Sequence, residues 1–230
     1  MKASKNDVER LGSLSVDCGF LLSHLIRQDS SNQNCDKNAL DTLRSILSSN
    51  GDISNPVLKG GKIGWYGLNN AKIFDPSCPH MPERPGYFSD PKQKHAVCFT
   101  ESTLFGLKAH VEIFNAKYGL AFTRKYLLAR GVNPCLNIRE DILKSKINEK
   151  SGLYDKLYNF IPDSLTGYVN IINDSFDAIH EREWRILGNF EFVLQDIFFI
   201  FCPSEDFHFF SHIQKDGMPN LFDLKWLDKI

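Results

Sequence analysis

The chain has 230 residues and a mass of 26.3 kDa, and 42% of its residues are hydrophobic while 24% are charged. These proportions predict a globular protein with a sizeable core and exclude the collagen-like, disordered and coiled-coil classes. The 27 Lys and Arg residues nearly balance the 28 Asp and Glu residues. The net charge therefore gives no reason to expect nucleic acid or an anionic membrane as a partner.

The N-terminal segment 1–17 is expected to be a loosely attached tail, and its polar, mixed-charge sequence lacks the apolar core of a secretory signal. The most apolar run, 197–202, is far shorter than the roughly 20 residues that span a bilayer. The six cysteines have no paired spacing, which favours reduced thiols over a disulfide framework. We expect a cytoplasmic protein with no membrane attachment, folded as one domain over 18–230.

The first third of that domain predicts a strand, a helix and a long loop. Phe20–Ile26 is a short apolar run typical of a strand. Asp36 is the expected N-cap of a helix that stops at Gly51 and whose apolar face is Leu40, Leu43, Ile46 and Leu47. Residues 52–94 carry many Gly and Pro residues, which predicts an irregular lid or binding loop.

The middle of the chain alternates clearly between strands and helices. Strands are expected at 95–100, 118–122 and 135–138. Between them, Ser102 or Thr103 is expected to cap one helix and Thr123 a second, which spans 125–130 and closes at Gly131. The first helix has its apolar positions at helical spacing, at Leu104, Leu107, Val111 and Phe114.

The last third predicts a mostly helical insertion followed by three short strands. The insertion covers 140–178, and the strands follow at 181–187, 190–194 and 197–201, with Gly188-Asn189 as a hairpin turn between the first two. Both halves of the chain then contribute strands, so we expect an α+β fold with a mixed or antiparallel sheet and flanking helices.

The sharpest local pattern is the run 181–185, Glu-Arg-Glu-Trp-Arg. Alternate side chains of a strand share a face, which places Glu181, Glu183 and Arg185 together. Two carboxylates on one face suit chemistry in which one binds a sugar hydroxyl while the other orients an attacking group. The alternative is a solvated edge strand in which Arg185 neutralises its neighbours.

Two further segments carry residues suited to a ligand. His24 lies in the first strand and Arg27 follows it, so the imidazole could bind a ribose or amide and the guanidinium a phosphate. The alternative is a core histidine bonded to a carbonyl. The run 98–103 joins a strand to a helix, where its hydroxyl groups either receive a polar ligand or cap the helix. The spacing of Cys78, His80, His95 and Cys98 is poor for zinc, so no metal is expected.

Four blocks occur in an order that resembles the AbiGi family, the antitoxin half of a bacterial abortive-infection system against phage. They are Ala96-Val97-Cys98-Phe99-Thr100-Glu101, Tyr118-Gly119-Leu120-Ala121-Phe122, Gly131-Val132-Asn133-Pro134 and Glu181-Arg182-Glu183-Trp184-Arg185. The resemblance extends over most of 18–230. It implies an antitoxin or regulator that acts by binding, either to a nucleotidyltransferase-like toxin or other defence protein or to a nucleotide.

The same order of blocks is also similar to the ADP-ribosyltransferase scaffold, which implies an alternative. There Glu183 would hold the nicotinamide ribose of NAD or a related nucleotide, with Glu181 as its helper and Arg185 beside them. The strand with Phe99 and Thr100 would form the cofactor wall, and His24 or Arg27 would supply a contact from the first strand. The implied activity is transfer of ADP-ribose to a target, or to water as in a NAD glycohydrolase.

Overall fold

The computed structural model describes residues 19–28, 31–48, 55–63, 72–73, 84–85, 95–101, 103–139, 141, 163–172, 174, 179, 182–214 and 219–229. The chain divides into two compact units. Unit 1 consists of Met1–Leu58, Phe99–Val132 and Glu191–Ile230, and unit 2 of Lys59–Cys98 and Asn133–Phe190. The single domain expected over 18–230 stays a prediction.

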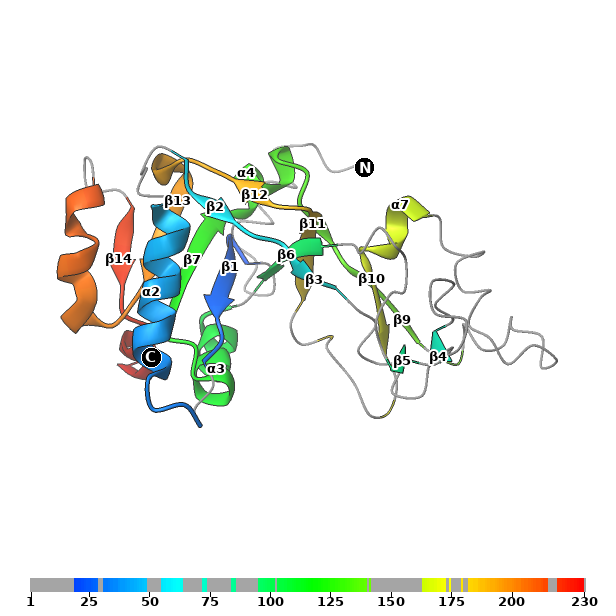
Figure 1. Cartoon of the computed structure of the whole chain (residues 1–230), viewed down its shortest axis with the longest axis horizontal. Coiled ribbons are helices and arrows are strands. Elements are labelled where there is room, and N and C mark those ends of the chain that lie inside the picture. Colours follow the sequence, from blue (N-terminus) through cyan, green and yellow to red (C-terminus); the bar gives the residue numbers. More distant parts are fainter. Residues whose placement is uncertain are drawn as a thin grey trace, which may run out of the picture. The chain divides into compact units, whose positions relative to one another are not determined.

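Unit 1 contains a mixed sheet (Figure 1). In spatial order it consists of β14 (Asn220–Phe222), β13 (Ile197–Phe201), β7 (Tyr118–Thr123) and β1 (Leu21–Ile26). β7 is antiparallel to β1 and β13, whereas β14 runs parallel to β13. This mixture confirms the expected α+β class. The near-continuous apolar run of β7 reflects its burial between two neighbours.

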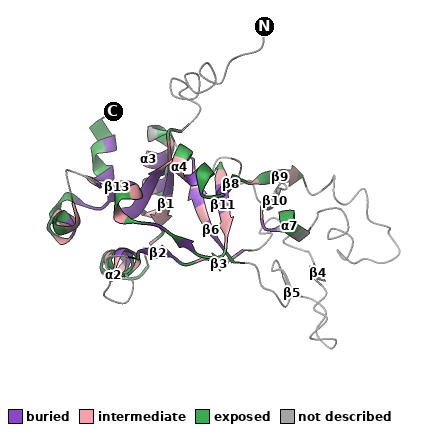
Figure 2. Ribbon diagram, turned by 90° about the horizontal axis from the view of Figure 1, so that it is seen from above, coloured by how far each residue is buried: buried purple, intermediate pink, exposed green. Residues whose placement is uncertain are grey.

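The two faces of this sheet are covered by different helices (Figure 2). α2 (Cys35–Leu47) packs on one face through Ala39, Leu43 and Leu47. The other face is covered by α3 (Leu104–Phe114) and the 3-10 segment η7 (Leu224–Lys229). The core on that side is formed by Leu107, Ala121, Phe201, Leu224 and Leu227.

The predicted caps at Thr103, Thr123 and Gly131 are observed, but neither predicted end of α2 is: α2 ends at Leu47 with Ser48 as its C-cap, before the expected stop at Gly51. The Thr103 hydroxyl accepts from the Gly106 N–H at 3.2 Å, and Thr123 does the same for α4 (Arg124–Ala129). Gly131 has the expected left-handed φ of 86°. The cap expected at Asp36 is wrong, because α2 already begins at Cys35 and Asp36 lies in its first turn.

Unit 2 is built on the first part of β6 (His95–Thr100) and on short strands. β11 (Glu183–Leu187) lies between β6 and β8 (Asn133–Pro134), and β3 (Gly61–Lys62) pairs with β6. Two separate pairs add β9 (Leu136–Arg139) with β10 (Val169–Ile172), and β4 (Lys72–Ile73) with β5 (Arg84–Pro85). The short helix α7 spans Asp163–Thr166.

Two predicted stretches differ from the structure where it describes them. Within 140–178 the run Val169–Ile172 is a strand parallel to β9 and not part of a helical insertion, because β-branched side chains favour the pleated conformation. Within 52–94 the described residues include the two-residue strands β2 (Val57–Leu58), β3, β4 and β5. Most of both stretches lies outside the described residues.

The hairpin expected at Gly188-Asn189 is wrong. β12 (Phe190–Glu191) pairs with β2 and not with β11. The strand expected at 190–194 also ends early, because the Asp196 carboxylate accepts from the Val193 N–H at 3.1 Å and the 3-10 turn η4 (Leu194–Asp196) follows. Two further 3-10 segments after β13 were not predicted, η5 (Ser204–Phe209) and η6 (Ser211–Ile213). No helix within the described part of the chain is long and apolar enough to cross a bilayer.

Candidate functional site

The predicted carboxylate strand is β11 in unit 2. Arg182 precedes it with a left-handed φ of 42°, so the alternation expected across 181–185 begins only at Glu183. From there Glu183 and Arg185 share a face, as predicted, while Trp184 is buried on the other. Glu181 lies outside the described residues. Because β6 and β8 flank β11, the strand is not the exposed edge that the alternative supposed.

Glu183 and Arg185 form a two-pronged ion pair within the strand. The Arg185 Nε donates to Glu183 Oε1 at 2.8 Å, and its Nη2 donates to Oε2 at 2.8 Å. Asn170 on β10 joins the pair from the side: its Nδ2 donates to Glu183 Oε2 at 2.9 Å, and its Oδ1 accepts from Arg185 at 2.7 Å. The third Arg185 nitrogen, Nη1, donates to the Gly167 carbonyl at 3.1 Å. Arg185 is only 2% exposed.

Charge and burial act against each other in this cluster. Burial by itself would raise the pKa of Glu183, but the Arg185 charge and hydrogen bonds from Arg185, Cys98 and Asn170 bring the pKa below its ordinary value. Burial raises the pKa of both neighbouring thiols, that of Cys135 to about 12 and that of Cys98 further still. The carboxylate is therefore ionised and the thiols are protonated at neutral pH, which makes the thiols poor nucleophiles.

This arrangement leaves Glu183 little capacity to hold a ligand. Its two oxygens already accept three bonds from Arg185 and Asn170, and the Cys98 thiol adds a fourth. Chemistry on a sugar would require the carboxylate to exchange a buried cation for a hydroxyl group. The sequence analysis missed Asn170, although an amide inside the β-branched run 169–172 is a recognisable sign of a buried polar partner.

The other predicted site residues lie in unit 1. The His24 ring meets the Phe99 ring edge-on, with centroids 6.1 Å apart, so these two are brought together. Thr100 is the Cα partner of Ser23 in the pairing of β6 with β1. Arg27 stacks its guanidinium over the Phe114 ring at 4.3 Å, which places it at the end of α3.

Unit 1 also contains a hollow of about 370 Å³ that the sequence did not predict. Its polar wall comes from the first turn of α2, the start of β7, and the segments η5 and η7. Two apolar residues, Leu40 and Pro203, complete the wall beside Tyr118. The charged side chains around it are three lysines and three acids: Lys37, Lys117 and Lys225, and Asp36, Glu205 and Asp206.

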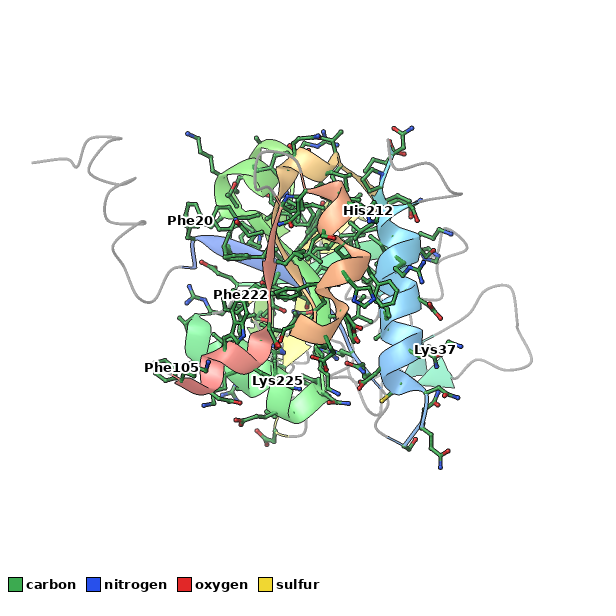
Figure 3. The ribbon with its side chains drawn as sticks, turned by 90° about the vertical axis from the view of Figure 1, so that its left-hand side faces the viewer. Phe20, Lys37, Phe105, His212, Phe222 and Lys225 are labelled. Atoms are coloured by element: carbon green, nitrogen blue, oxygen red, sulfur yellow. The ribbon has the colours of Figure 1, made fainter. Side chains whose placement is uncertain are left out.

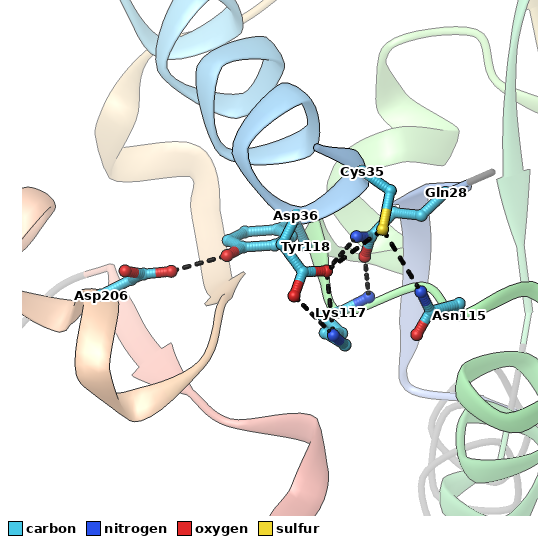
Figure 4. A network of polar contacts seen from close by, with 7 residues as sticks. All are labelled: Gln28, Cys35, Asp36, Asn115, Lys117, Tyr118 and Asp206. Carbon is cyan, nitrogen blue, oxygen red and sulfur yellow. Dashed lines mark hydrogen bonds and ion pairs between the residues drawn. The ribbon is translucent and has the colours of Figure 1, made fainter. Parts of the chain in front are cut away.

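A network of hydrogen bonds fixes one side of this hollow (Figure 4). Lys117 Nζ lies 2.9 and 2.7 Å from the two oxygens of Asp36, and the hydrogen bond from Lys117 is the main reason why the pKa of Asp36 is lowered. The Tyr118 hydroxyl donates to Asp206 at 2.6 Å. Burial and that bond raise the pKa of Tyr118, so the phenol stays a neutral donor. Gln28, just after β1, joins the same network. Its side-chain Nε2 donates to Asp36 on α2, and its Oε1 accepts from the backbone N–H of Lys117 just before β7.

Neither metal ligands nor relatives point to a further site. Across the described ranges, no group of three or more His, Cys, Asp and Glu side chains is arranged to hold a metal ion. Comparison with family models, with curated proteins and with solved structures finds no match for this chain.

Proposed function

We propose that the protein acts by binding a protein partner, as an antitoxin or regulator in bacterial defence against phage. The resemblance to the AbiGi family supports this role, and one structural observation carries the binding: Phe105 and Ile113 on α3 are 72% and 71% exposed. Such side chains on one helix are typical of a surface that another protein covers.

The two residues belong to one face of α3. At about 100° per residue, Phe105, Ala109 and Ile113 lie within about 80° of one another. All three are exposed; we call them the α3 face. The opposite side of the helix packs into unit 1 through Leu107 and Val111. A helix that is apolar on both sides is normally covered on both sides, and Figure 3 shows Phe105 at the outer edge of unit 1.

Binding is favoured over NAD chemistry because of the state of Glu183. In the enzymatic alternative this carboxylate stabilises positive charge that develops on a ribose. Here it already neutralises Arg185, which is buried and has no other carboxylate partner among the described ion pairs. Exchange of that partner would leave a buried guanidinium uncompensated, at a cost of about 3–5 kcal/mol.

The test measures the affinity of the purified protein for a nucleotidyltransferase-like toxin from the same genome by titration calorimetry. The double variant F105S/I113S should weaken binding by at least about tenfold, since buried interface anchors cost more than about 1.4 kcal/mol each when removed. Leu128→Ser is the matched control, because Leu128 is also exposed but belongs to α4. Equal affinities of the wild type and the double variant would refute the proposal.

A second measurement addresses the enzymatic alternative separately. Wild-type protein is incubated with NAD, and free nicotinamide is followed by chromatography. We expect no release above the rate without protein. Steady release would support the alternative that uses Glu183 and Glu181, and it would contradict a function by binding alone.

A further inference from the structure

We propose that the hollow in unit 1 binds a small phosphorylated molecule that carries hydroxyl groups, of the size of a nucleoside monophosphate or a sugar phosphate. This site is separate from the α3 face and does not depend on the proposed partner. Its volume of about 370 Å³ falls within the range of small-molecule sites, about 300–1,000 Å³.

On one side of the hollow, the polar side chains are already bonded to one another. Lys117 is held by both oxygens of Asp36, and Tyr118 is held by Asp206. These contacts tie the start of α2 to the start of β7 and tie β7 to η5. They set the shape of the wall before any ligand arrives, so little ordering is needed on binding.

Two lysines of the hollow take no part in these bonds. Lys37 on α2 and Lys225 on η7, both labelled in Figure 3, line the hollow, and among the described residues neither ammonium group forms an ion pair. A phosphate has several terminal oxygens, so it can accept from two ammonium groups that come from different elements. Lysine is a common phosphate ligand, acting as a point charge.

Two carboxylates on the same wall can accept further hydrogen bonds. Glu205 forms no ion pair with any described residue, and Asp206 has one oxygen beyond the atom that accepts from Tyr118. Bare phosphate would be repelled by these carboxylates. A ligand that also carries hydroxyl groups donates to them instead, so the acids select a phosphorylated polyol over a simple anion. Leu40 and Pro203 leave room for an apolar part beside these groups.

The experiment titrates the full chain with adenosine monophosphate, ribose 5-phosphate, inorganic phosphate and adenosine in separate calorimetric runs. We expect one or both of the first two to bind at least about tenfold more tightly than the last two. Tighter binding of adenosine monophosphate than of ribose 5-phosphate identifies a nucleotide, and equal binding identifies a sugar phosphate. No binding by either of the first two, or phosphate binding as tightly as they do, would overturn the proposal.

Variants locate the site. Lys225→Ala should weaken the best ligand by about tenfold or more, the usual effect of losing a hydrogen bond to a charged group. Lys229→Ala on the same segment η7 is the matched control, because that side chain is exposed and lies outside the hollow. Glu205→Gln should weaken ribose 5-phosphate more than inorganic phosphate. Equal effects of the two lysine variants would refute this location, and the toxin titration with F105S/I113S remains an independent result.

Discussion

Replacement of Glu183 by glutamine should destabilise the protein strongly, because it removes the counter-ion of a buried guanidinium. Arg185 is 2% exposed, and both of its bonds to Glu183 are 2.8 Å long. Breaking a buried ion pair from one side costs about 3–5 kcal/mol, a large share of a typical stability of about 5–15 kcal/mol. For a chain of this size the loss corresponds to a fall in Tm of roughly 6–20 °C.

Circular dichroism with thermal and urea unfolding measures this loss. Glu112→Gln is the control, since Glu112 is exposed on α3 and forms no ion pair among the described residues, and it should change the free energy of unfolding by less than about 0.5 kcal/mol. The double variant E183L/R185M should be more stable than E183Q, because it removes the buried cation together with its partner.

The effect must also depend on pH. The pKa of Glu183 is lowered in the folded protein, while in the unfolded chain it lies near the ordinary value of about 4.3. The stabilisation is therefore complete above about pH 5, and it is lost as the pH falls through the lower folded pKa. The Tm values of wild type and E183Q should converge in acid. A difference below about 1 kcal/mol at neutral pH, or one that does not change with pH, would refute this account.

Three further predictions concern the backbone, a cap and the thiols. Gly119→Ala should cost about 3 kcal/mol or more in urea unfolding, because its Cβ would lie 2.4 Å from the His24 carbonyl oxygen; Gly131→Ala meets no atom within 4 Å and should cost only about 1–2 kcal/mol, through its φ of 86°. Equal losses would contradict this distinction. Thr103→Ala should cost about 1 kcal/mol by removal of the α3 cap, and an unchanged Tm would show that the cap contributes nothing. Alkylation with iodoacetamide, mapped by mass spectrometry, should modify Cys35 well before Cys98 and Cys202, because burial raises the pKa of the latter two thiols; faster modification of Cys98 would indicate that unit 2 opens readily.

The sequence predicted the parts of the fold that depend on local chemistry. The spans of β6 and β13, the caps at Thr103 and Thr123 and the stop at Gly131 follow from apolar periodicity and from the side-chain requirements of helix ends. Which strands pair with one another could not be predicted in this way. Gly188-Asn189 has the composition of a tight turn, yet β12 pairs with β2, because pairing is decided by long-range packing that no local pattern contains.

In the candidate sites, too, only the features that depend on local sequence could be predicted. The shared face of Glu183 and Arg185 follows from the two-residue period of a strand. Asn170 and Cys98 join them only through folding, and the hollow in unit 1 collects residues from α2, β7, η5 and η7. Asp36 illustrates the limit: an acid near a helix start predicts a cap, but a lysine 81 positions later, Lys117, binds both of its oxygens.

The chain crosses between the two units four times, and this has a consequence for how the protein folds during synthesis. β1 pairs with a strand about a hundred residues later, Leu21 opposite Thr123, and the neighbour of that strand begins only at Ile197. The sheet of unit 1 therefore cannot close until β13 has left the ribosome, and its high contact order predicts slow folding. A chain that ends before β13 would leave one edge of β7 unpaired, so premature termination should yield an aggregating product and not a smaller working protein.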